Sequence, residues 1–200
     1  MLLESLVRQT LAVKDHRVVK VVREFDGLQV LLAPRLNRRL ICSGCGGRAP
    51  LYDKLAERPW RHVPLWGIPV TLIYSPRRVS CPCCGVKVEK LPWAEGKHRL
   101  TIPLVIVLAT WSRLLSMGGV ARLFGVSWPT VGSAVRQAVA YGLDHREPAR
   151  ALYIGVDEVS RKKGHTYQTV VYDLAERRLL WTGAGRGQET LARFFADRAK

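Results

Sequence analysis

Two cysteine pairs with matching surroundings carry the clearest chemistry in this sequence. Cys42 and Cys45 form one C-x-x-C pair, Cys81 and Cys84 form another, and glycine follows each pair. A tight turn can aim both thiolates of such a pair at one ion, and glycine permits the left-handed bend after the second cysteine. Two pairs supply the four ligands of tetrahedral zinc. We therefore predict a structural Zn²⁺ site with no open position for chemistry.

The second pair contains an extra thiol, and one histidine is a further candidate ligand. In Cys81-Pro82-Cys83-Cys84 we assign the outer two cysteines, because their spacing copies the first pair. The alternative is that the thiols are free and buried. His62 lies between two tryptophans, where a packed or DNA-facing histidine is commoner than a ligand. A basic pair and a short strand-like stretch precede each cysteine pair, at Arg38-Arg39 and Arg77-Arg78.

One aspartate could hold a catalytic metal. Asp157 ends the short apolar run 154–156, and residues 169–172 are predicted to form an antiparallel neighbouring strand. A carboxylate held rigidly in a sheet suits a divalent ion such as Mg²⁺ that promotes phosphoryl transfer. A solvated aspartate at a strand end is the alternative, and spacing alone favours that alternative.

Two helices with a glycine-containing turn between them are predicted in the middle of the chain. Thr101 can cap a helix over residues 102–116, and Ser127 can cap another over residues 128–141. Residues 119–124 form a short segment between them. This is the layout of a helix-turn-helix, and an ordinary helical hairpin is the alternative.

The second of these helices has two expected faces. Core positions are Val131, Val135 and Ala138. The residues expected to contact the major groove of DNA are Ser127, Trp128, Thr130, Ser133 and Arg136.

The charge of the chain favours a nucleic-acid partner. Lysine and arginine outnumber aspartate and glutamate by 32 to 16, and residues 1–150 hold 23 of the basic and 10 of the acidic side chains. An anionic membrane is the weaker alternative, because the basic residues do not line one amphipathic helix. No apolar run is long enough to span a bilayer, and no signal-peptide pattern begins the chain. We expect a cytoplasmic chain, in which five cysteines favour metal over disulfides.

These patterns predict a multidomain α+β protein. Strand signals also appear at residues 17–32 and 178–182, and a helical pattern covers residues 188–199. The expected segments are an N-terminal β-hairpin region (1–34), a zinc-binding β module (35–100), an all-α helix-turn-helix (101–143), a linker (144–150) and an α/β domain (151–200).

A series of motifs, in this order, resembles one known family. They are Cys42-x-x-Cys45, Trp60-Arg61-His62, Cys81-Pro82-x-Cys84-Gly85-Val86, Pro92-Trp93-Ala94-Glu95, Val120-Ala121-Arg122-Leu123, Gly155-Val156-Asp157-Glu158 and Lys163-Gly164-His165. Together they resemble the bacterial insertion-sequence DDE transposases of the ISL-three group, over essentially all 200 residues. Cys83 is a small departure from the pattern of the family.

The resemblance implies a fold and a reaction. It implies a zinc-binding module, a helix-turn-helix that reads terminal inverted repeats in double-stranded DNA, and an RNase H-like domain. Two Mg²⁺ ions held by Asp, Asp and Glu would then drive strand cleavage and transfer at the bacterial nucleoid. Asp157 matches the first of these carboxylates. Homo-oligomers are compatible with the pattern, and the sequence does not select an oligomeric state.

The end of the sequence departs from that pattern. Lys200 falls within the helix that precedes the strand of the second aspartate, and neither Asp173 nor Asp197 matches its position. We expect a truncated transposase that binds DNA but lacks the second Asp and the Glu. The alternatives are a non-catalytic competitor or repressor at element ends and, less favoured, a zinc-ribbon adaptor for RNA or protein.

Overall fold

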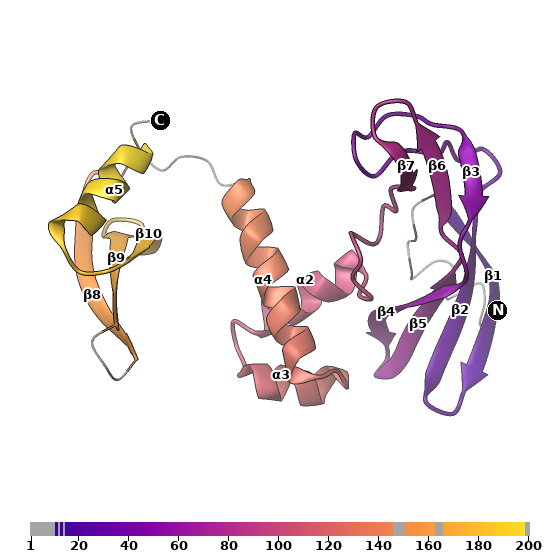
Figure 1. The fold of residues 1–200 in the computed structure, drawn as a ribbon. Helices are drawn as coiled ribbons and strands as arrows, with labels where there is room; N and C mark the ends of the chain where they lie inside the picture. Colours follow the sequence, from indigo (N-terminus) through magenta and orange to yellow (C-terminus); the bar gives the residue numbers. More distant parts are fainter. Residues whose placement is uncertain (1–10, 12, 14, 146–150, 163–165, 199–200) are drawn as a thin grey trace. The chain divides into compact units, whose positions relative to one another are not determined.

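The computed structural model describes residues 11, 13, 15–145, 151–162 and 166–198 (Figure 1). The chain divides into two compact units, Met1–Asp144 and His145–Lys200. Most of the expected linker (residues 146–150) and the motif Lys163-Gly164-His165 lie outside the described residues.

A four-stranded sheet in the order β1-β2-β5-β4 forms much of the first unit (Figure 1). Its strands are β1 (His16–Glu24), β2 (Gly27–Pro34), β4 (Arg58–Leu65) and β5 (Ile68–Tyr74). β1 and β2 form an antiparallel hairpin, and β2 pairs in parallel with β5. The sheet therefore joins the N-terminal hairpin to residues that lie between the two cysteine pairs. Val30, Val70 and Leu72 are buried on one face, as the period-two alternation of strands requires.

A smaller sheet in the order β3-β6-β7 carries the second cysteine pair. Its strands are β3 (Leu51–Lys54), β6 (Arg77–Cys81) and β7 (Gly85–Val88). β6 is central, pairs antiparallel with both neighbours and ends at Cys81. The buried cluster of this sheet is small, comprising Cys42, Ala49, Val79 and Cys81. Two of these four buried residues are cysteines, so the cysteines form a large part of the core beneath this sheet.

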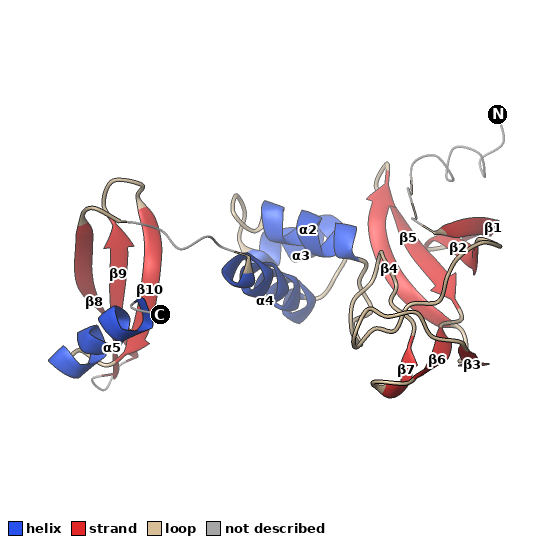
Figure 2. Cartoon of the chain, turned by 90° about the horizontal axis from the view of Figure 1, so that it is seen from above, coloured by secondary structure: helices blue, strands red, loops and turns tan. Residues whose placement is uncertain are grey.

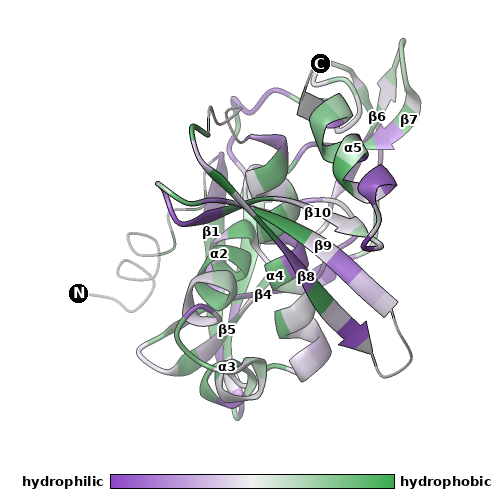
Figure 3. Cartoon of the chain, turned by 90° about the vertical axis from the view of Figure 1, so that its left-hand side faces the viewer, coloured by the Kyte–Doolittle hydropathy of each residue, from purple (hydrophilic) through white to green (hydrophobic). Residues whose placement is uncertain are grey.

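The described residues of the first unit contain three helices, which contact one another (Figure 2). They are α2 (Ile102–Trp111), α3 (Met117–Phe124) and α4 (Trp128–Asp144). Their common core includes Leu104, Leu108, Val120 and Val131, all buried. α2 is apolar along nearly its whole length (Figure 3). Ile106 on this helix remains exposed.

The first helix is shorter than the sequence suggests. Thr101 caps it as expected, because its hydroxyl accepts a hydrogen bond from Leu104 N. The helix ends at Trp111 instead of near residue 116, and the backbone N–H and the hydroxyl of Ser112 both donate to Leu108 O. Ser116 then caps α3 by accepting a hydrogen bond from Gly119 N. The expected single helix is wrong here, because the serine hydroxyls compete with helix continuation.

In the second unit, the described residues form a three-stranded antiparallel sheet and one helix. Its elements are β8 (Ile154–Lys162), β9 (Thr166–Asp173), β10 (Arg178–Ala184) and α5 (Gln188–Arg198), and the strand order is β10-β9-β8. Phe194 of α5 packs on Val171 of β9 and Leu180 of β10. The first strand continues well beyond Asp157, so the alternative of an aspartate at a strand end is wrong in its position. Phe195, the next residue of α5, is exposed.

The described residues form a mixed α/β chain with four helices and three sheets. None of the described helices combines the length and the apolar character needed to cross a membrane.

Candidate metal centre and nucleic-acid interface

Each cysteine pair lies in a tight turn that ends in a left-handed glycine. In the first turn, Cys42 N donates to Gly47 O at 2.8 Å and Gly46 N donates to Cys42 O at 3.0 Å. Gly46 has a φ of 73°, and Gly85, which follows the second pair, has a φ of 69°. These values are strained for residues with a Cβ atom, so each glycine permits the bend that the cysteine spacing predicted.

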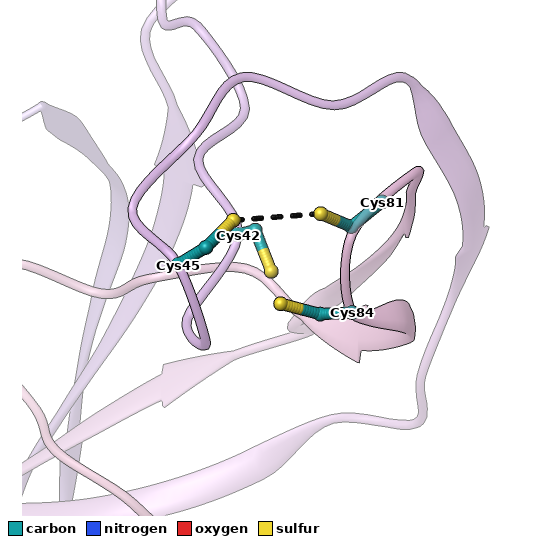
Figure 4. Close-up of side chains that lie close together, drawn as sticks. All are labelled: Cys42, Cys45, Cys81 and Cys84. Carbon is teal, nitrogen blue, oxygen red and sulfur yellow. Dashed lines mark hydrogen bonds between the residues drawn. The ribbon is translucent and has the colours of Figure 1, made fainter.

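The two turns bring four sulfur atoms together (Figure 4). The Sγ atoms of Cys42, Cys45, Cys81 and Cys84 all lie within 4.8 Å of one another. The distance between Cys45 Sγ and Cys81 Sγ is 3.5 Å. Tetrahedral zinc with Zn–S bonds of about 2.3 Å needs sulfur atoms roughly 3.8 Å apart, so this donor set fits a structural zinc ion. Cys83 is exposed and is not part of the cluster.

The close approach of the turns depends on Gly44. A Cβ atom at Gly44 would lie 3.0 Å from Cys84 Sγ and 3.7 Å from Cys42 Sγ. A side chain at this position would therefore crowd the sulfur of Cys84, one of the four metal ligands, while its approach to Cys42 would be an ordinary contact. The position of Gly44 in the first pair is restricted as well as the cysteines.

The hydrogen bonds in the cluster give the thiols unequal acidity. Backbone N–H groups of Cys84 and Cys83 lower the pKa of Cys81 to about 7. The hydrogen bond to Cys45 and burial raise the pKa of Cys84 to about 12. Four thiolates cannot share this space without a cation, because their charges repel. Zinc binding would therefore release protons from the cluster.

His62 belongs to the packing and lies outside the metal cluster. It is buried on β4, and its Nδ1 forms a 2.8 Å hydrogen bond with Thr101 Oγ1, the cap of α2. Burial lowers the pKa of His62 to about 4, so the ring is neutral near pH 7. The residue therefore connects the four-stranded sheet to the helices.

The predicted DNA-contacting residues lie at the start of α4. Ser127 caps this helix, since its hydroxyl accepts a hydrogen bond from Thr130 N at 3.4 Å. Ser127, Trp128 and Arg136 are exposed, and Trp128 keeps 60% of its surface accessible. Thr130 and Ser133 are half-buried, so they present less surface than expected. α3 ends at Gly125 in the left-handed conformation, which turns the chain into α4.

The expected core face of α4 is correct only in part. Val131 is fully buried, whereas Val135 and Ala138 are half-buried. Gly132 and Ala134, which the pattern did not assign to the core, are buried. Small residues here allow close packing against the neighbouring helices.

Asp157 lies in the middle of β8 with an exposed side chain. It pairs with Val170 on β9, and the next residue, Val171, packs on α5. Val170 and Val171 lie on opposite faces of the sheet, because successive residues of a strand alternate. Alternation along the strand therefore directs Asp157 to the sheet face away from α5, and Glu158 to the opposite face. The Asp157 carboxylate accepts a hydrogen bond from Glu158 N at 2.8 Å.

The two later aspartates have local structural roles. Asp173 is buried, and its carboxylate accepts hydrogen bonds from Ala175 N and Glu176 N and pairs with Arg178. Hydrogen bonding by Glu176 N is the main cause that lowers the pKa of Asp173. Trp181 Nε1 donates to Asp197 Oδ2 at 3.2 Å. Among the described residues, the cysteine cluster is the one group of three or more metal-binding side chains that could share an ion.

Comparisons with known proteins match both candidate sites. The family model of ISL3-group DDE transposases, described as "Transposase", matches residues 154–200. A second model, described as the zinc-finger of transposase IS204/IS1001/IS1096/IS1165, matches residues 38–87. The first match begins three residues before Asp157, and the second contains all four clustered cysteines.

Two curated relatives extend this similarity over most of the chain. The transposase for insertion sequence element IS1001 of Bordetella parapertussis is 30% identical over 169 residues, which are 84% of this chain and 41% of that protein. The transposase for insertion sequence element IS1557 of Mycobacterium tuberculosis is 32% identical over 200 residues, 95% of this chain and 45% of that protein. The chain thus spans less than half the length of these relatives. No solved structure matches the chain.

Proposed function

We propose, from the premise that this chain is a relative of the ISL-three insertion-sequence transposases, that it acts in DNA transposition by binding the ends of an insertion sequence. Its target is then double-stranded DNA that carries terminal inverted repeats, and its place in the cell is the bacterial nucleoid. The basic excess of residues 1–150 supports this proposal, because phosphate neutralisation supplies much of the affinity for DNA.

The zinc module and the helices have different roles in DNA binding. In this proposal residues 35–100 form a module whose zinc is structural, and residues 101–143 form a helix-turn-helix. α3, the turn at Gly125 and α4 have the order of that motif, and the start of α4 enters the major groove. Arg136 and Trp128 are then the exposed side chains that reach base edges and backbone. Homo-oligomers that hold both ends of an element are part of this proposal.

Asp157 takes the role of the first metal-binding carboxylate. Residues 151–200 would be the first part of an RNase H-like domain, an assignment supported by the antiparallel strands β8, β9 and β10 and the helix that follows them. Mg²⁺ held there with further carboxylates would activate water or a 3′-hydroxyl for attack on a phosphodiester. Asp157 itself would supply a rigid, exposed oxygen ligand from the middle of a strand.

One observation carries the proposal. The predicted ligands Cys42, Cys45, Cys81 and Cys84 converge within 4.8 Å in the same compact unit as α4. A zinc-organised unit of strongly basic composition with an exposed helix start is built for duplex binding.

The test compares two duplexes of equal length and composition. Fluorescence anisotropy should show tighter binding to the terminal repeat of the element than to its scrambled sequence. Arg136→Ala should weaken the repeat complex by about tenfold to a hundredfold if this arginine contacts a base. Arg113→Ala on the 112–116 segment removes the same charge and is the control. Equal binding of both duplexes, or preference for RNA or protein, would reject this function.

A second candidate function is DNA binding without catalysis, as a competitor or repressor at element ends. It is favoured by the contacts of Asp173 and Asp197, whose carboxylates are engaged with a turn and with Trp181. Nicking of supercoiled plasmid in Mg²⁺ or Mn²⁺ separates the two functions. Nicking by the wild type that disappears in Asp157→Ala would favour catalysis by this chain. A wild-type chain that binds the repeat but does not nick the plasmid would favour the role of a competitor or repressor.

A further inference from the structure

A pocket lined by four arginines lies within the zinc-binding module (residues 35–100). Its volume is about 380 Å³, and the arginines are Arg38, Arg39, Arg48 and Arg77. Leu40, Ala49 and Pro50 complete its lining. We call this site the arginine pocket. Three of its arginines belong to the basic pairs that precede the two cysteine pairs.

The repeated sequence layout explains how two of these arginines meet. Arg38 lies four residues before Cys42, and Arg77 lies four residues before Cys81. Both converge on Glu89: Arg38 Nη1 donates to Oε2 at 2.6 Å, and Arg77 Nη2 donates to Oε2 at 2.8 Å. Glu89 also forms a backbone bridge with Cys42. The same short segments therefore position the metal ligands and the pocket.

Glu89 orients these arginines without neutralising the pocket. Its side chain is fully buried, and Oε1 also accepts hydrogen bonds from Tyr74 Oη at 2.6 Å and Arg77 N at 2.9 Å. This one carboxylate contacts Arg38 and Arg77, and the lining of the pocket holds four arginines and no acidic side chain, so positive charge exceeds negative charge at the pocket. Because Glu89 holds Arg38 and Arg77 in place, their positive charge stays fixed at the pocket.

The other two arginines are available to a ligand. Arg39 and Arg48 are exposed, and no hydrogen bond or ion pair of either side chain is found among the described residues. Guanidinium groups match the oxygen spacing of phosphate and can donate two parallel hydrogen bonds to it. We propose that the arginine pocket binds one phosphate of the DNA backbone, with Arg39 and Arg48 as the direct contacts.

This inference rests on the proposed function and adds a role for the zinc module. Zinc fixes Cys42 and Cys81, and through them it fixes the segments that carry Arg38 and Arg77. The module then sets the position of the chain along the duplex through a phosphate contact, and leaves base reading to α4. Such a contact contributes affinity and register with little dependence on base sequence.

The first arm of the test is a double variant with a charge-matched control. Arg39→Ala/Arg48→Ala removes the proposed contacts, and Arg17→Ala/Arg23→Ala removes two exposed arginines of β1. Both should retain one zinc per chain and an unchanged melting temperature. Duplex titrations at several salt concentrations should show about tenfold weaker binding for the pocket variant. Its slope of log affinity against log salt should fall in magnitude by about 0.9, the value for one phosphate.

The second arm uses inorganic phosphate and the side-chain Nε–H signals of arginine in ¹⁵N NMR. Saturable shifts of Arg39 and Arg48, without comparable shifts of Arg17 and Arg23, support the pocket. Equal shifts at all four arginines, or equal losses of duplex affinity in the two double variants, would show a diffuse basic surface and overturn the inference. Phosphate shifts with unchanged duplex affinity in the pocket variant would reveal a free-anion site and also overturn it. If the wild-type chain binds neither the terminal-repeat duplex nor its scrambled counterpart, the proposed function itself is rejected.

Discussion

Glu89 places a full negative charge in the interior of the first unit. Desolvation opposes this charge, but hydrogen bonds from Arg77, Tyr74 and Arg38 outweigh desolvation, and the pKa of Glu89 is lowered. The buried side chain connects the four-stranded sheet, the smaller sheet and the segment that leads into Cys42. It therefore acts as a structural centre for residues distant in the sequence.

Replacing this charge should be costly. Glu89→Gln leaves two arginines without their carboxylate, and we expect a loss of about 3 kcal/mol in the free energy of unfolding. Asp53→Asn is the matched control, because it breaks the more exposed pair with Arg78, and its cost should be much smaller than that of Glu89→Gln. Urea denaturation of the zinc-loaded chain measures both. Similar losses in the two variants would contradict this role for Glu89.

His62 makes stability depend on pH. Its pKa is about 4 in the folded chain against an ordinary value of 6.5, so the unfolded chain binds the extra proton between these values. The stabilisation is present above pH 6.5 and is lost as pH falls toward about 4. From about pH 7 to about pH 5 we expect the wild type to lose about 2 kcal/mol more than His62→Asn. Parallel curves for the two chains, measured with excess zinc, would show that the ring is not buried as described.

Residues differ in how far the sequence could reveal their roles. The cysteine ligands were found because turn chemistry is local and repeats in the chain. The partners of Glu89 and of His62 lie far away in the sequence, since Arg38 and Glu89 are 51 positions apart and His62 and Thr101 are 39 positions apart. No local pattern signals such pairs, so the roles of these buried residues became visible only in the structure.

At the scale of elements, the two sheets of the first unit differ in what holds them together. The four-stranded sheet shares a core that includes Val30, Leu72 and Trp60, whereas the β3-β6-β7 sheet buries little besides its cysteines. Small modules with so little apolar burial depend on their metal.

Zinc removal should therefore act selectively. After chelation, hydrogen–deuterium exchange should rise strongly in β6 and β7, while β2 and β5 keep most of their protection. The physical reason is that zinc is the main cross-link between the two cysteine turns. Uniform loss of protection across both sheets would mean that they unfold as one cooperative unit. Unchanged exchange in β6 would rule out a structural zinc.

The sequence predicted where the helices and strands lie better than it predicted where each one ends. Hydrophobic alternation located the hairpin and the three strands of the second unit, and turn residues located the helices. The helix after Thr101 ended early because Ser112 bonds back to Leu108, and β8 extended past Asp157 because polar residues can pair at an exposed edge. The parallel pairing of β2 with β5 joins distant segments and had no local signal.

At the scale of the whole molecule, the two units differ in their cores. The core of the second unit, in the part of the chain that the structure describes, centres on Val171, Leu180 and Phe194. β8 lies at a sheet edge, with Val156 and Val159 exposed. The first unit instead has separate buried clusters in its sheet and in its helices.

Hydrogen exchange should reflect this difference. We expect amides of β8 and β10 to exchange faster than those of β5 and α2 in the same zinc-loaded sample, because fewer buried contacts oppose local opening. Mass spectrometry of peptic fragments measures both units at once. Equal protection would indicate that the second unit packs against a partner that covers its exposed edge.

If zinc organises the DNA-binding unit, DNA binding should depend on zinc, and one titration measures this dependence. Zinc is added stepwise to metal-free chain, and binding to a terminal-repeat duplex is followed by anisotropy. We expect binding to rise with zinc and to reach its plateau at one equivalent per chain, with preference for the repeat over a scrambled duplex. Full repeat binding by metal-free chain, or no repeat binding at saturating zinc, would show that zinc does not organise this unit for DNA binding.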